Sequence, residues 1–295
     1  MREKFIGTYD DDVYWQRVDR SQAWLGETDE EQHAAQLKLR GATVGIAGCG
    51  GIGGAVAVRL ARLGVLNLKV ADPDAFDWTN INRQLGATRH TVGRNKAQVV
   101  AELAHDLAGD VTVEVFEEGI TPENAEEFVA GCDVVLDQMD FYLIRARYAL
   151  HRAFRKDPRP LCVLSAWCVG WGTSVYKYTH DSEPIEERYG LPEDAELTPE
   201  VIKELMEKFV PKAWRFPSVE VIEDWLINKR KVPLFAGTPP IAEAHAVQRT
   251  ALVLTGLERE PYATVLPPSP MSFFYDGSTL EAELIDTSTG KRVDT

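Results

Sequence analysis

A cluster of five glycines between an apolar run and a helix-like segment constrains this chain more than any other feature. The run TVGIAG at 43–48 is typical of a buried strand, and apolar residues at Val56, Leu60 and Leu63 have helical spacing. Glycine permits a sharp turn between the two and a close approach of the backbone to a phosphate. The segment therefore predicts a strand, a turn and a helix whose free N–H groups can bind an anion. The glycines are Gly48, Gly50, Gly51, Gly53 and Gly54.

An acidic residue follows the glycines at the spacing typical of nucleotide-binding βαβ units. The apolar segment LKVAD ends in Asp72, about twenty residues further on, where a carboxylate can accept hydrogen bonds from ribose hydroxyls. A glycine motif by itself is a weak signal, because it also serves tight packing. Its position between a strand and a helix, with Asp72 following, predicts a nucleotide-binding half-sheet.

Cationic and amide residues come next. Asn80, Arg83 and Gln84 follow the second strand, and Lys96 lies at the start of the helix-like segment VGRNKAQVVAEL. A later apolar strand, CDVVLD, leads to two further acids. The carboxyl ends of parallel strands meet at one edge of a sheet, where open α/β sheets bind ligands, so we expect these side chains to gather there. The two acids are Asp137 and Asp140.

This set of side chains distinguishes two kinds of nucleotide chemistry. Cations neutralise charge that grows on phosphate oxygens, and a carboxylate holds Mg²⁺ while the ion keeps several waters. A nicotinamide-dependent dehydrogenase has no use for such a cluster beside the phosphates. The pattern favours phosphoryl or nucleotidyl transfer.

Five short motifs, in this order, resemble the signature of the ThiF/MoeB-type adenylyltransferases, which are relatives of the ubiquitin-activating enzymes. The family patterns are Gly-x-Gly-Gly-x-Gly, Asp-x-Asp, Ser/Thr-Asn-x-x-Arg-Gln, Gly-x-x-Lys and Asp-x-x-Asp. The resemblance extends from near residue 17 to residue 256. The motifs stand here at 48–53, at Asp72 with Asp74, and at 79–84, 93–96 and 137–140.

The resemblance implies a reaction in which a carboxylate attacks the α-phosphate of ATP to give an acyl-adenylate and pyrophosphate. The implied substrate is the C-terminus of a ubiquitin-like or carrier protein, a peptide or a small acid. Asp72 would hold the ribose, Asp140 would hold Mg²⁺, and three residues would contact the phosphates. Those three are Asn80, Arg83 and Lys96.

The resemblance also extends to flanking residues. Arg20 is similar to an arginine that reaches into the neighbouring subunit's nucleotide site in the family, which implies a homodimer. Asp74 and Gln84 could contact the nucleotide or equally hold the loop in place. Further expected contacts to the nucleotide are Gly48, Gly50, Gly51, Gly53 and Asp137.

Departures from the family pattern concern cysteine and the wall of the site. Many members carry two Cys-x-x-Cys pairs that bind zinc, but the four cysteines here form no such pair, so we expect no zinc. Segment 180–235 has no cysteine that could accept the acyl group. Cys168, in SAWCVGWG, has the pattern of a small core residue. Phe141 stands where the family usually has asparagine, which makes this wall more aromatic.

Composition sets outer limits. The chain has 295 residues, is 44% hydrophobic and carries a net charge of −14. It has no apolar run of ~18 residues, so no membrane span is expected. The acidity argues against nucleic acid as a partner. Unpaired cysteines and the lack of a secretory signal favour the cytoplasm.

Strands that alternate with helices predict a doubly wound, mostly parallel Rossmann-like α/β sheet with an antiparallel extension. Strands are expected at 43–48, 67–72, 111–116, 132–137 and 161–166, with helices at 53–64, 92–107, 122–130 and 141–155. We expect 1–295 to form one ThiF-like domain. Its parts are an N-terminal helical segment (1–40), a nucleotide-binding core (41–178), a helical crossover insertion (179–235), a closing helix (236–257) and a C-terminal hairpin and tail (258–295).

Two alternatives to adenylation stay open. A noncatalytic scaffold could keep the fold to bind a partner, although Arg83, Lys96 and Asp140 would then have no reason to remain clustered. An NAD-dependent oxidoreductase would use the glycines and Asp72 but leave Arg83 and Gln84 without a role. Binding of Mg·ATP or of NADH distinguishes these possibilities.

Overall fold

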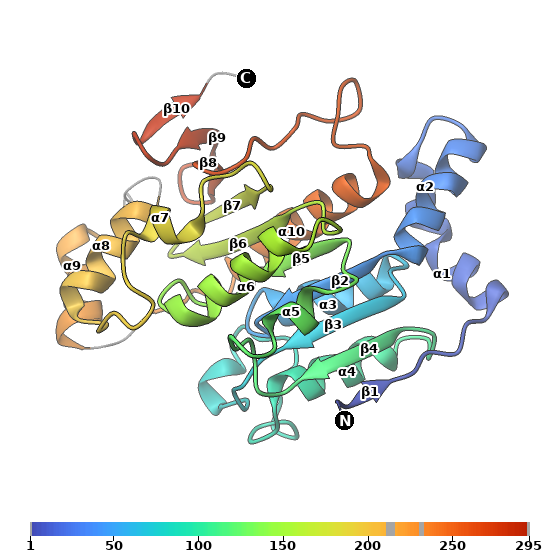
Figure 1. Ribbon diagram of the computed structural model, residues 1–295, viewed down its shortest axis with the longest axis horizontal. Coiled ribbons are helices and arrows are strands. Elements are labelled where there is room, and N and C mark those ends of the chain that lie inside the picture. Colours follow the sequence, from blue (N-terminus) through green and yellow to red (C-terminus); the bar gives the residue numbers. More distant parts are fainter. Residues whose placement is uncertain (1, 211–215, 230–232, 294–295) are drawn as a thin grey trace.

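A single ten-stranded sheet runs through the molecule, with helices on both faces (Figure 1). The computed structural model describes residues 2–210, 216–229 and 233–293. The strand order is β1-β4-β3-β2-β5-β6-β7-β8-β9-β10. The strands are β1 (Lys4–Phe5), β2 (Thr43–Ala47), β3 (Asn67–Ala71), β4 (Thr112–Phe116), β5 (Val134–Asp137), β6 (Val163–Val169), β7 (Gly172–Tyr178), β8 (Met271–Asp276), β9 (Glu281–Asp286) and β10 (Lys291–Val293).

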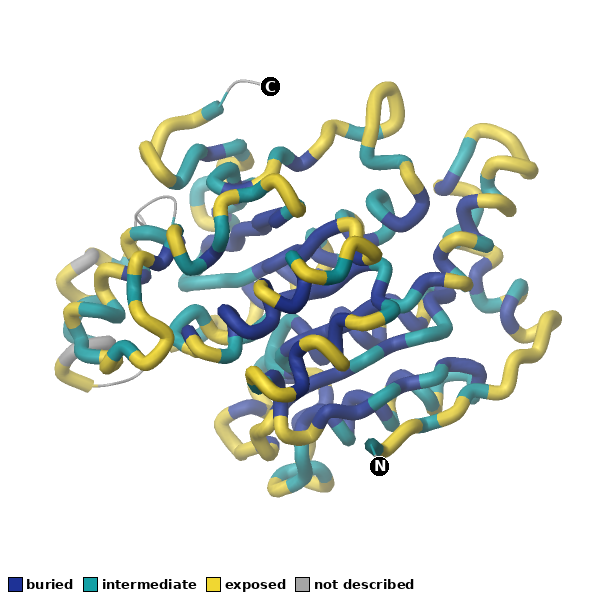
Figure 2. Tube along the Cα trace, viewed as in Figure 1, coloured by how far each residue is buried: buried dark blue, intermediate teal, exposed yellow. Residues whose placement is uncertain are grey.

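Five neighbouring strands, β4, β3, β2, β5 and β6, are parallel. This confirms the doubly wound sheet, because β2 lies in the middle and the chain winds outward from it in both directions. Central parallel strands are covered on both faces and therefore read as continuous apolar runs. Val44 and Ile46 of β2 are fully buried, and Figure 2 shows the central strands in the colour of buried residues.

Strands β7 to β10 form the expected antiparallel extension. β7 pairs antiparallel with β6 and β8, and β9 pairs antiparallel with β8. The C-terminal hairpin expected within 258–295 is formed by β8 and β9, and between them Asp276 Oδ1 accepts a hydrogen bond from the Ser278 backbone N at 2.7 Å. The short strand β1, which pairs with β4, was not predicted.

Helices cover the two faces of the sheet in separate groups. One face packs against α2 (Asp29–Gly41), α3 (Gly53–Arg62), α4 (Lys96–His105) and α10 (Pro239–Thr255), and its buried side chains form one apolar cluster. The other face packs against α5 (Ala125–Val129), α6 (Ile144–Lys156), α7 (Ile185–Tyr189) and α8 (Pro199–Phe209), which contribute to a second cluster. The helix α1 (Asp11–Gln22) lies at the outer edge beside α2 (Figure 1).

The expected helical insertion is present. Helix α8 begins after Thr198, whose Oγ1 accepts a hydrogen bond from the Val201 backbone N at 3.4 Å. A second helical stretch comprises α9 (Val219–Glu223) and the π-helical turn η3 (Asp224–Asn228). Within the described residues, no helix combines the length and the apolar character needed to cross a membrane.

Candidate active site

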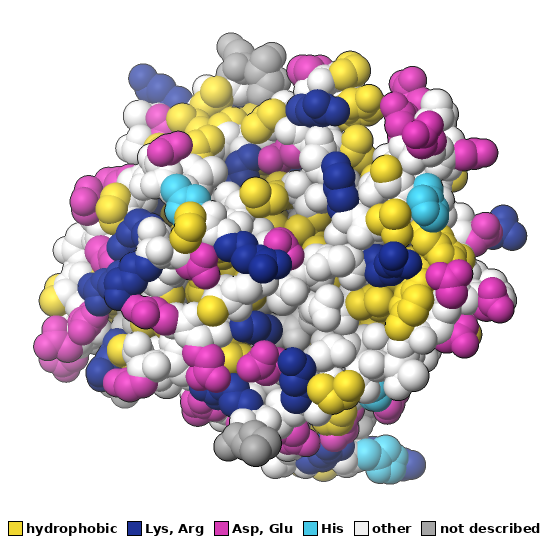
Figure 3. Space-filling view, turned by 45° about the vertical axis from the view of Figure 1, so that its right-hand side comes forward, with side chains coloured by type: hydrophobic (Ala, Val, Ile, Leu, Met, Phe, Trp, Pro, Cys, Tyr) yellow, Lys and Arg dark blue, Asp and Glu magenta, His cyan; other side chains and the backbone are white. Residues whose placement is uncertain are grey.

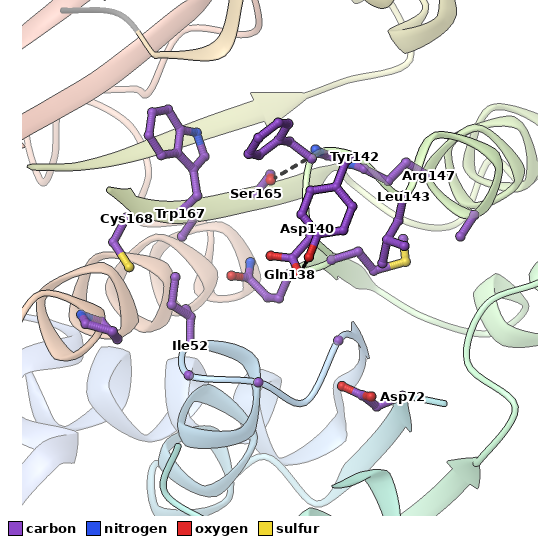
Figure 4. A pocket seen from close by; sticks show the side chains of 18 of the residues that line it. Ile52, Asp72, Gln138, Asp140, Tyr142, Leu143, Arg147, Ser165, Trp167 and Cys168 are labelled. Atoms are coloured by element: carbon purple, nitrogen blue, oxygen red, sulfur yellow. Dashed lines mark hydrogen bonds between the residues drawn. The ribbon is translucent and has the colours of Figure 1, made fainter. Parts of the chain in front are cut away.

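A cavity of about 630 Å³ opens at the carboxyl ends of β2, β3, β5 and β6. This is where a doubly wound sheet places its ligands. Figure 4 shows Asp72 and Ile52 on one side of it, Asp140 and Gln138 near its middle, and Ser165 and Trp167 on the other side. Predicted residues that line it are Gly48, Gly50, Gly51, Asp72, Asp74, Arg83, Gln84, Lys96 and Asp140.

The glycine loop is shaped by backbone contacts that exclude side chains. Gly48 has φ +100° and donates its N–H to the Ala71 carbonyl at 2.7 Å. A Cβ on Gly48 would lie 2.5 Å from the Gln138 carbonyl oxygen, and one on Gly53 would lie 1.9 Å from the Gly48 carbonyl oxygen. Glycine is therefore required at both positions, and α3 can begin at Gly53 directly behind the turn.

We expect Gly53→Ala to destabilise the fold by about 1–3 kcal/mol, because the added methyl group overlaps backbone that must move. The same movement should abolish nucleotide binding. Gly51→Ala is the matched control for stability, since its Cβ would meet only Arg83 and Pro239 side-chain atoms at 3.6–3.7 Å. Urea unfolding measures both variants, and equal stability of the two would show that the contact with Gly48 is unimportant.

Asp72 links the glycine loop to the end of β3. Its Oδ2 accepts a hydrogen bond from the Cys49 backbone N at 2.7 Å, and its Oδ1 accepts one from the Asp74 backbone N at 2.9 Å. Burial raises the pKa of this carboxyl, while the charge of Lys96 opposes the rise. Asp72 thus holds the turn and presents a carboxylate at the edge of the cavity.

Lys96 and Arg83 bring positive charge to the same cavity. Lys96 is the first residue of α4, is 8% exposed, and donates from Nζ to Asp74 Oδ2 at 2.9 Å. Arg83 donates from Nη1 to the Thr79 carbonyl at 3.1 Å and to Asn82 Oδ1 at 3.0 Å. Burial lowers the pKa of Arg83, which nonetheless keeps its charge. Both cations therefore face the space in front of the glycine loop.

Asp140 supplies an acceptor on the loop after β5. Its side chain is exposed, and its Oδ2 accepts a hydrogen bond from the Tyr142 hydroxyl at 2.6 Å. Within the described part of the chain, no cluster of three or more His, Cys, Asp or Glu side chains could hold a metal. A single carboxylate nevertheless fits Mg²⁺, which takes most of its ligands from phosphates and water.

Gln84 is buried against the glycine loop. Its Nε2 lies 3.9 Å from where a Cβ on Gly50 would be, and its Oε1 has no hydrogen-bond partner among the described residues. This position supports a role in holding the loop and leaves one acceptor available at the cavity wall.

Four predicted residues, Gly53, Asn80, Asp137 and Arg20, are not among the described residues that line the cavity. Asn80 Oδ1 accepts a hydrogen bond from the Asp77 backbone N at 3.0 Å and so caps the short helical turn η2 (Trp78–Asn80). Asp137 is fully buried and ion-paired with Arg147. Arg20 has a 99% exposed side chain on α1, outside the cavity of its own subunit.

The part of the cavity wall on the face of the sheet covered by α6, α7 and α8 was not predicted from the sequence. Arg147, Trp167, Tyr176 and Phe209 all line the cavity. Cys168, expected to be a core residue, is half-buried and also lines it. The signal for Arg147 was available: Arg147 and His151 are four residues apart on α6 and both contact Asp137.

The sequence of the insertion leaves open whether Trp214, Phe216 and Trp225 line a specificity surface or pack the helices down, and it favours packing. Phe216 is 68% exposed and does not line the cavity, nor does Trp225. Trp214 lies outside the described residues. The insertion instead contributes Met206 and Phe209 of α8 to the wall.

Comparison with known proteins gives a match to the family model described as "ThiF family" over residues 20–247. Adenylyltransferase and sulfurtransferase MOCS3 of Anopheles gambiae is 35% identical over 143 residues, 48% of this chain and 32% of the relative. tRNA threonylcarbamoyladenosine dehydratase of Haemophilus influenzae is 38% identical over 35% of this chain and 40% of the relative. SAMP-activating enzyme E1 of Haloferax volcanii is 35% identical over 45% of this chain and 48% of the relative. The matches thus span less than half the length of these relatives.

Solved structures share the fold at low sequence identity. PaaA superposes with a TM-score of 0.67 at 18% identity and covers 95% of this chain and 75% of its own. Escherichia coli MccB crystallised with ATP has a TM-score of 0.65 at 20% identity and covers 95% and 72%. Both likenesses establish the Rossmann-like α/β architecture.

Proposed function

The chain belongs to the ThiF family, and from this premise we propose that it is an ATP-dependent adenylyltransferase. It would convert a carboxylate into an acyl-adenylate and release pyrophosphate. The observation that carries this proposal is the meeting of Arg83, Lys96 and Asp140 in one cavity with the glycine loop. Similar chemistry supports it, because MOCS3 is named an adenylyltransferase and MccB is crystallised with ATP.

In the proposed reaction a carboxylate oxygen of the substrate forms a bond to the α-phosphorus. The bond from that phosphorus to the oxygen bridging the β-phosphate breaks, and pyrophosphate leaves with the electron pair. Arg83 and Lys96 would neutralise the charge that grows on the phosphate oxygens. Asp72 would accept hydrogen bonds from the ribose, and Asp140 would hold Mg²⁺, which supplies further positive charge to the phosphates. Zinc has no proposed role.

Lys96 has a partner that a nucleotide could replace. Asp74, which accepts its hydrogen bond, is 68% exposed at the side chain. Asp74 can therefore be rehydrated when Lys96 turns to a phosphate. The ion pair would hold Lys96 in place before ATP arrives without preventing the exchange of partners.

The activated group is proposed to be the C-terminus of a carrier protein or peptide, or a small carboxylic acid. The name SAMP-activating enzyme E1 and the structure of MccB with MccA support a protein or peptide substrate. A phosphate-backbone partner is not proposed, because the chain carries a net charge of −14. On the face seen in Figure 3, Lys and Arg side chains are interspersed with Asp and Glu.

A cytoplasmic location is proposed from the cysteines. Cys49, Cys132, Cys162 and Cys168 are all free thiols. Free, largely buried thiols suit a reducing compartment.

Two measurements test the proposed function. Calorimetry should show binding of Mg·ATP and none of NADH; the reverse would favour an NAD-dependent oxidoreductase, and binding of neither would favour a noncatalytic scaffold. ATP–pyrophosphate exchange should then appear with at least one acid in a panel of Gly-Gly-ending proteins, peptides and free carboxylic acids. Binding of Mg·ATP without exchange for any of these acids would count against adenylation.

We expect Cys168→Ala to retain both adenylation and product formation. Burial raises the pKa of the Cys168 thiol to about 12, so at neutral pH it is protonated and a poor nucleophile. The chain would therefore stop at the adenylate and leave its discharge to another nucleophile. Mass spectrometry after iodoacetamide treatment at pH 8 should show slow alkylation at Cys168. Complete loss of product with adenylation intact would instead identify a thioester at this residue.

A homodimer is proposed from Arg20. Arg20 Nε lies 3.6 Å from Asp19 Oδ2, and the Arg20 side chain is 99% exposed, as a residue that serves a neighbouring subunit would be. Sedimentation should show dimers at micromolar concentration, and Arg20→Ala should lower exchange without changing the monomer fold. Monomers alone would remove Arg20 from the site.

A further inference from the structure

The cavity extends beyond the residues that are proposed to bind ATP. Its second part lies on the face of the sheet covered by α6, α7 and α8. Strand β6 sends alternate side chains to opposite faces, so Trp167 and Cys168 point to opposite sides of it (Figure 4). The order β2-β5-β6-β7 separates β7 from the glycine-loop strand by three strand spacings. At about 4.8 Å per spacing this is about 14 Å. We call this second region the aromatic arm; it is lined by Phe141, Trp167, Tyr176, Tyr178, Met206 and Phe209.

The walls of the aromatic arm are fixed in place. The ring centroids of Trp167 and Tyr176 are 6.3 Å apart and their planes differ by 15°. The ring centroids of Tyr176 and Tyr178 are 6.4 Å apart and their planes differ by 22°. The Tyr176 hydroxyl donates to the Phe209 carbonyl at 2.7 Å, which ties α8 to β7. The three rings thus form a row of nearly parallel planes, and helix α8 is hydrogen-bonded beside it.

The polar groups of the arm are almost all occupied. Arg147 donates to Asp137 at 2.7 Å, to the Tyr189 hydroxyl at 2.8 Å and to Ser165 Oγ at 3.3 Å. Its charge is balanced by Asp137, so the arm does not attract a second carboxylate. The buried indole Nε1 of Trp167, by contrast, has no hydrogen-bond partner among the described residues.

We propose that the aromatic arm receives the side group of the acid that is activated, and that this group is bulky and apolar, with aromatic groups preferred. The proposal rests on the proposed function, because it places the carboxylate where it can attack the α-phosphorus and the side group beyond it. An acid ending in glycine would leave the half-buried side chains of Phe141, Trp167 and Met206 in contact with water, whereas a large side group would bury them. Trp167 Nε1 would donate to an acceptor of the acid, such as the last amide carbonyl of a peptide.

The chemistry is shared by a free aromatic amino acid and by a peptide that ends in one. ATP–pyrophosphate exchange should therefore be compared for free phenylalanine, for peptides ending in Phe or Leu, and for a peptide ending in Gly-Gly. We expect kcat/KM for the better Phe-ended acid to exceed that for the Gly-Gly peptide by at least tenfold. Free phenylalanine and the peptides together show which source is used.

Equal or better exchange with the Gly-Gly peptide would overturn this inference while leaving adenylation established. Exchange with the Gly-Gly peptide and none with any bulky acid would overturn it in the same way. Failure to bind Mg·ATP would instead mean that the proposed function itself is wrong.

Variants of the arm give a second, independent test. Met206→Phe narrows the arm and should raise KM for the bulky acid at least tenfold, with KM for Mg·ATP unchanged. Ile202→Phe is the matched control, because Ile202 lies on the same helix but does not line the cavity. Trp167→Phe keeps the wall but removes the N–H donor, and should raise the same KM about tenfold. Unchanged KM in both Met206→Phe and Trp167→Phe would show that the arm does not hold the substrate.

Discussion

Lys96→Ala is expected to lower ATP–pyrophosphate exchange by about 10²–10³-fold, the loss typical of removing one preorganised group that stabilises a transition-state charge. Lys96 is 8% exposed and lines the cavity beside the glycine loop, so few waters could replace its ammonium group. Stability should change little, because the partner left behind, Asp74, is 68% exposed. Exchange assays with saturating acid, together with thermal unfolding, measure the two effects.

Two controls make this prediction specific. Lys156→Ala removes the same charge at an exposed site, where Lys156 pairs with Glu126, and should leave exchange unchanged. Asp74→Asn removes the carboxylate partner of Lys96 but keeps the ammonium group, and should retain most of the exchange. Wild-type exchange in Lys96→Ala would mean that the phosphates lie elsewhere.

Arg147→Ala is expected to destabilise the protein by about 3–5 kcal/mol, because it leaves the buried carboxylate of Asp137 without its cation. Burial acts to raise the pKa of Asp137, but Arg147 and His151 outweigh it and hold this pKa below its ordinary value. In the native protein the pair therefore contributes stability above the ordinary carboxyl pKa and loses it only in acid. Urea unfolding at pH 7 measures the loss.

The same substitution should reverse the pH dependence. Without Arg147, burial dominates and the pKa of Asp137 rises, so protonation favours the folded state. The Arg147→Ala variant should then become more stable as the pH falls from 7 to 5, whereas the wild type should not. Replacing both partners, as Asp137→Leu with Arg147→Met, should recover much of the loss, because apolar replacements of buried ion pairs are often tolerated. A loss below about 1 kcal/mol for Arg147→Ala, comparable to an exposed pair, would contradict a buried ion pair.

The parallel core was predictable because its strands are short apolar runs followed by turn residues and amphipathic helices. β2, β3, β5 and β6 lie within two residues of the expected bounds at each end, except that β6 continues to Val169. The edge strand β1 was missed because two residues carry no detectable alternation, and it exists only through pairing with β4.

The glycine side of the cavity was predictable for a related reason. Its residues directly follow consecutive strands, and parallel strands bring such positions to one edge. Arg83 and Lys96 therefore line the cavity as expected. Asn80 does not line the cavity, because its side chain accepts a hydrogen bond from the Asp77 backbone N–H. Asp137 does not either, because its buried carboxylate pairs with Arg147.

The aromatic part of the cavity was not predictable, because residues from distant parts of the sequence form it. Trp167 and Phe209 are brought to one cavity by α8, which packs on β7 after a long excursion of the chain. Sequence spacing carries no information on such a contact. Phe216 and Trp225 of the insertion, for which a specificity surface was the less favoured of two interpretations, lie outside the cavity.

A crystal structure with Mg²⁺ and a nonhydrolysable ATP analogue tests the nucleotide site most directly. We predict the triphosphate against the N–H groups of the glycine loop, with Arg83 and Lys96 on its oxygens, the ribose at Asp72 and Mg²⁺ on Asp140. A triphosphate bound away from Arg83 and Lys96 would contradict the proposed chemistry.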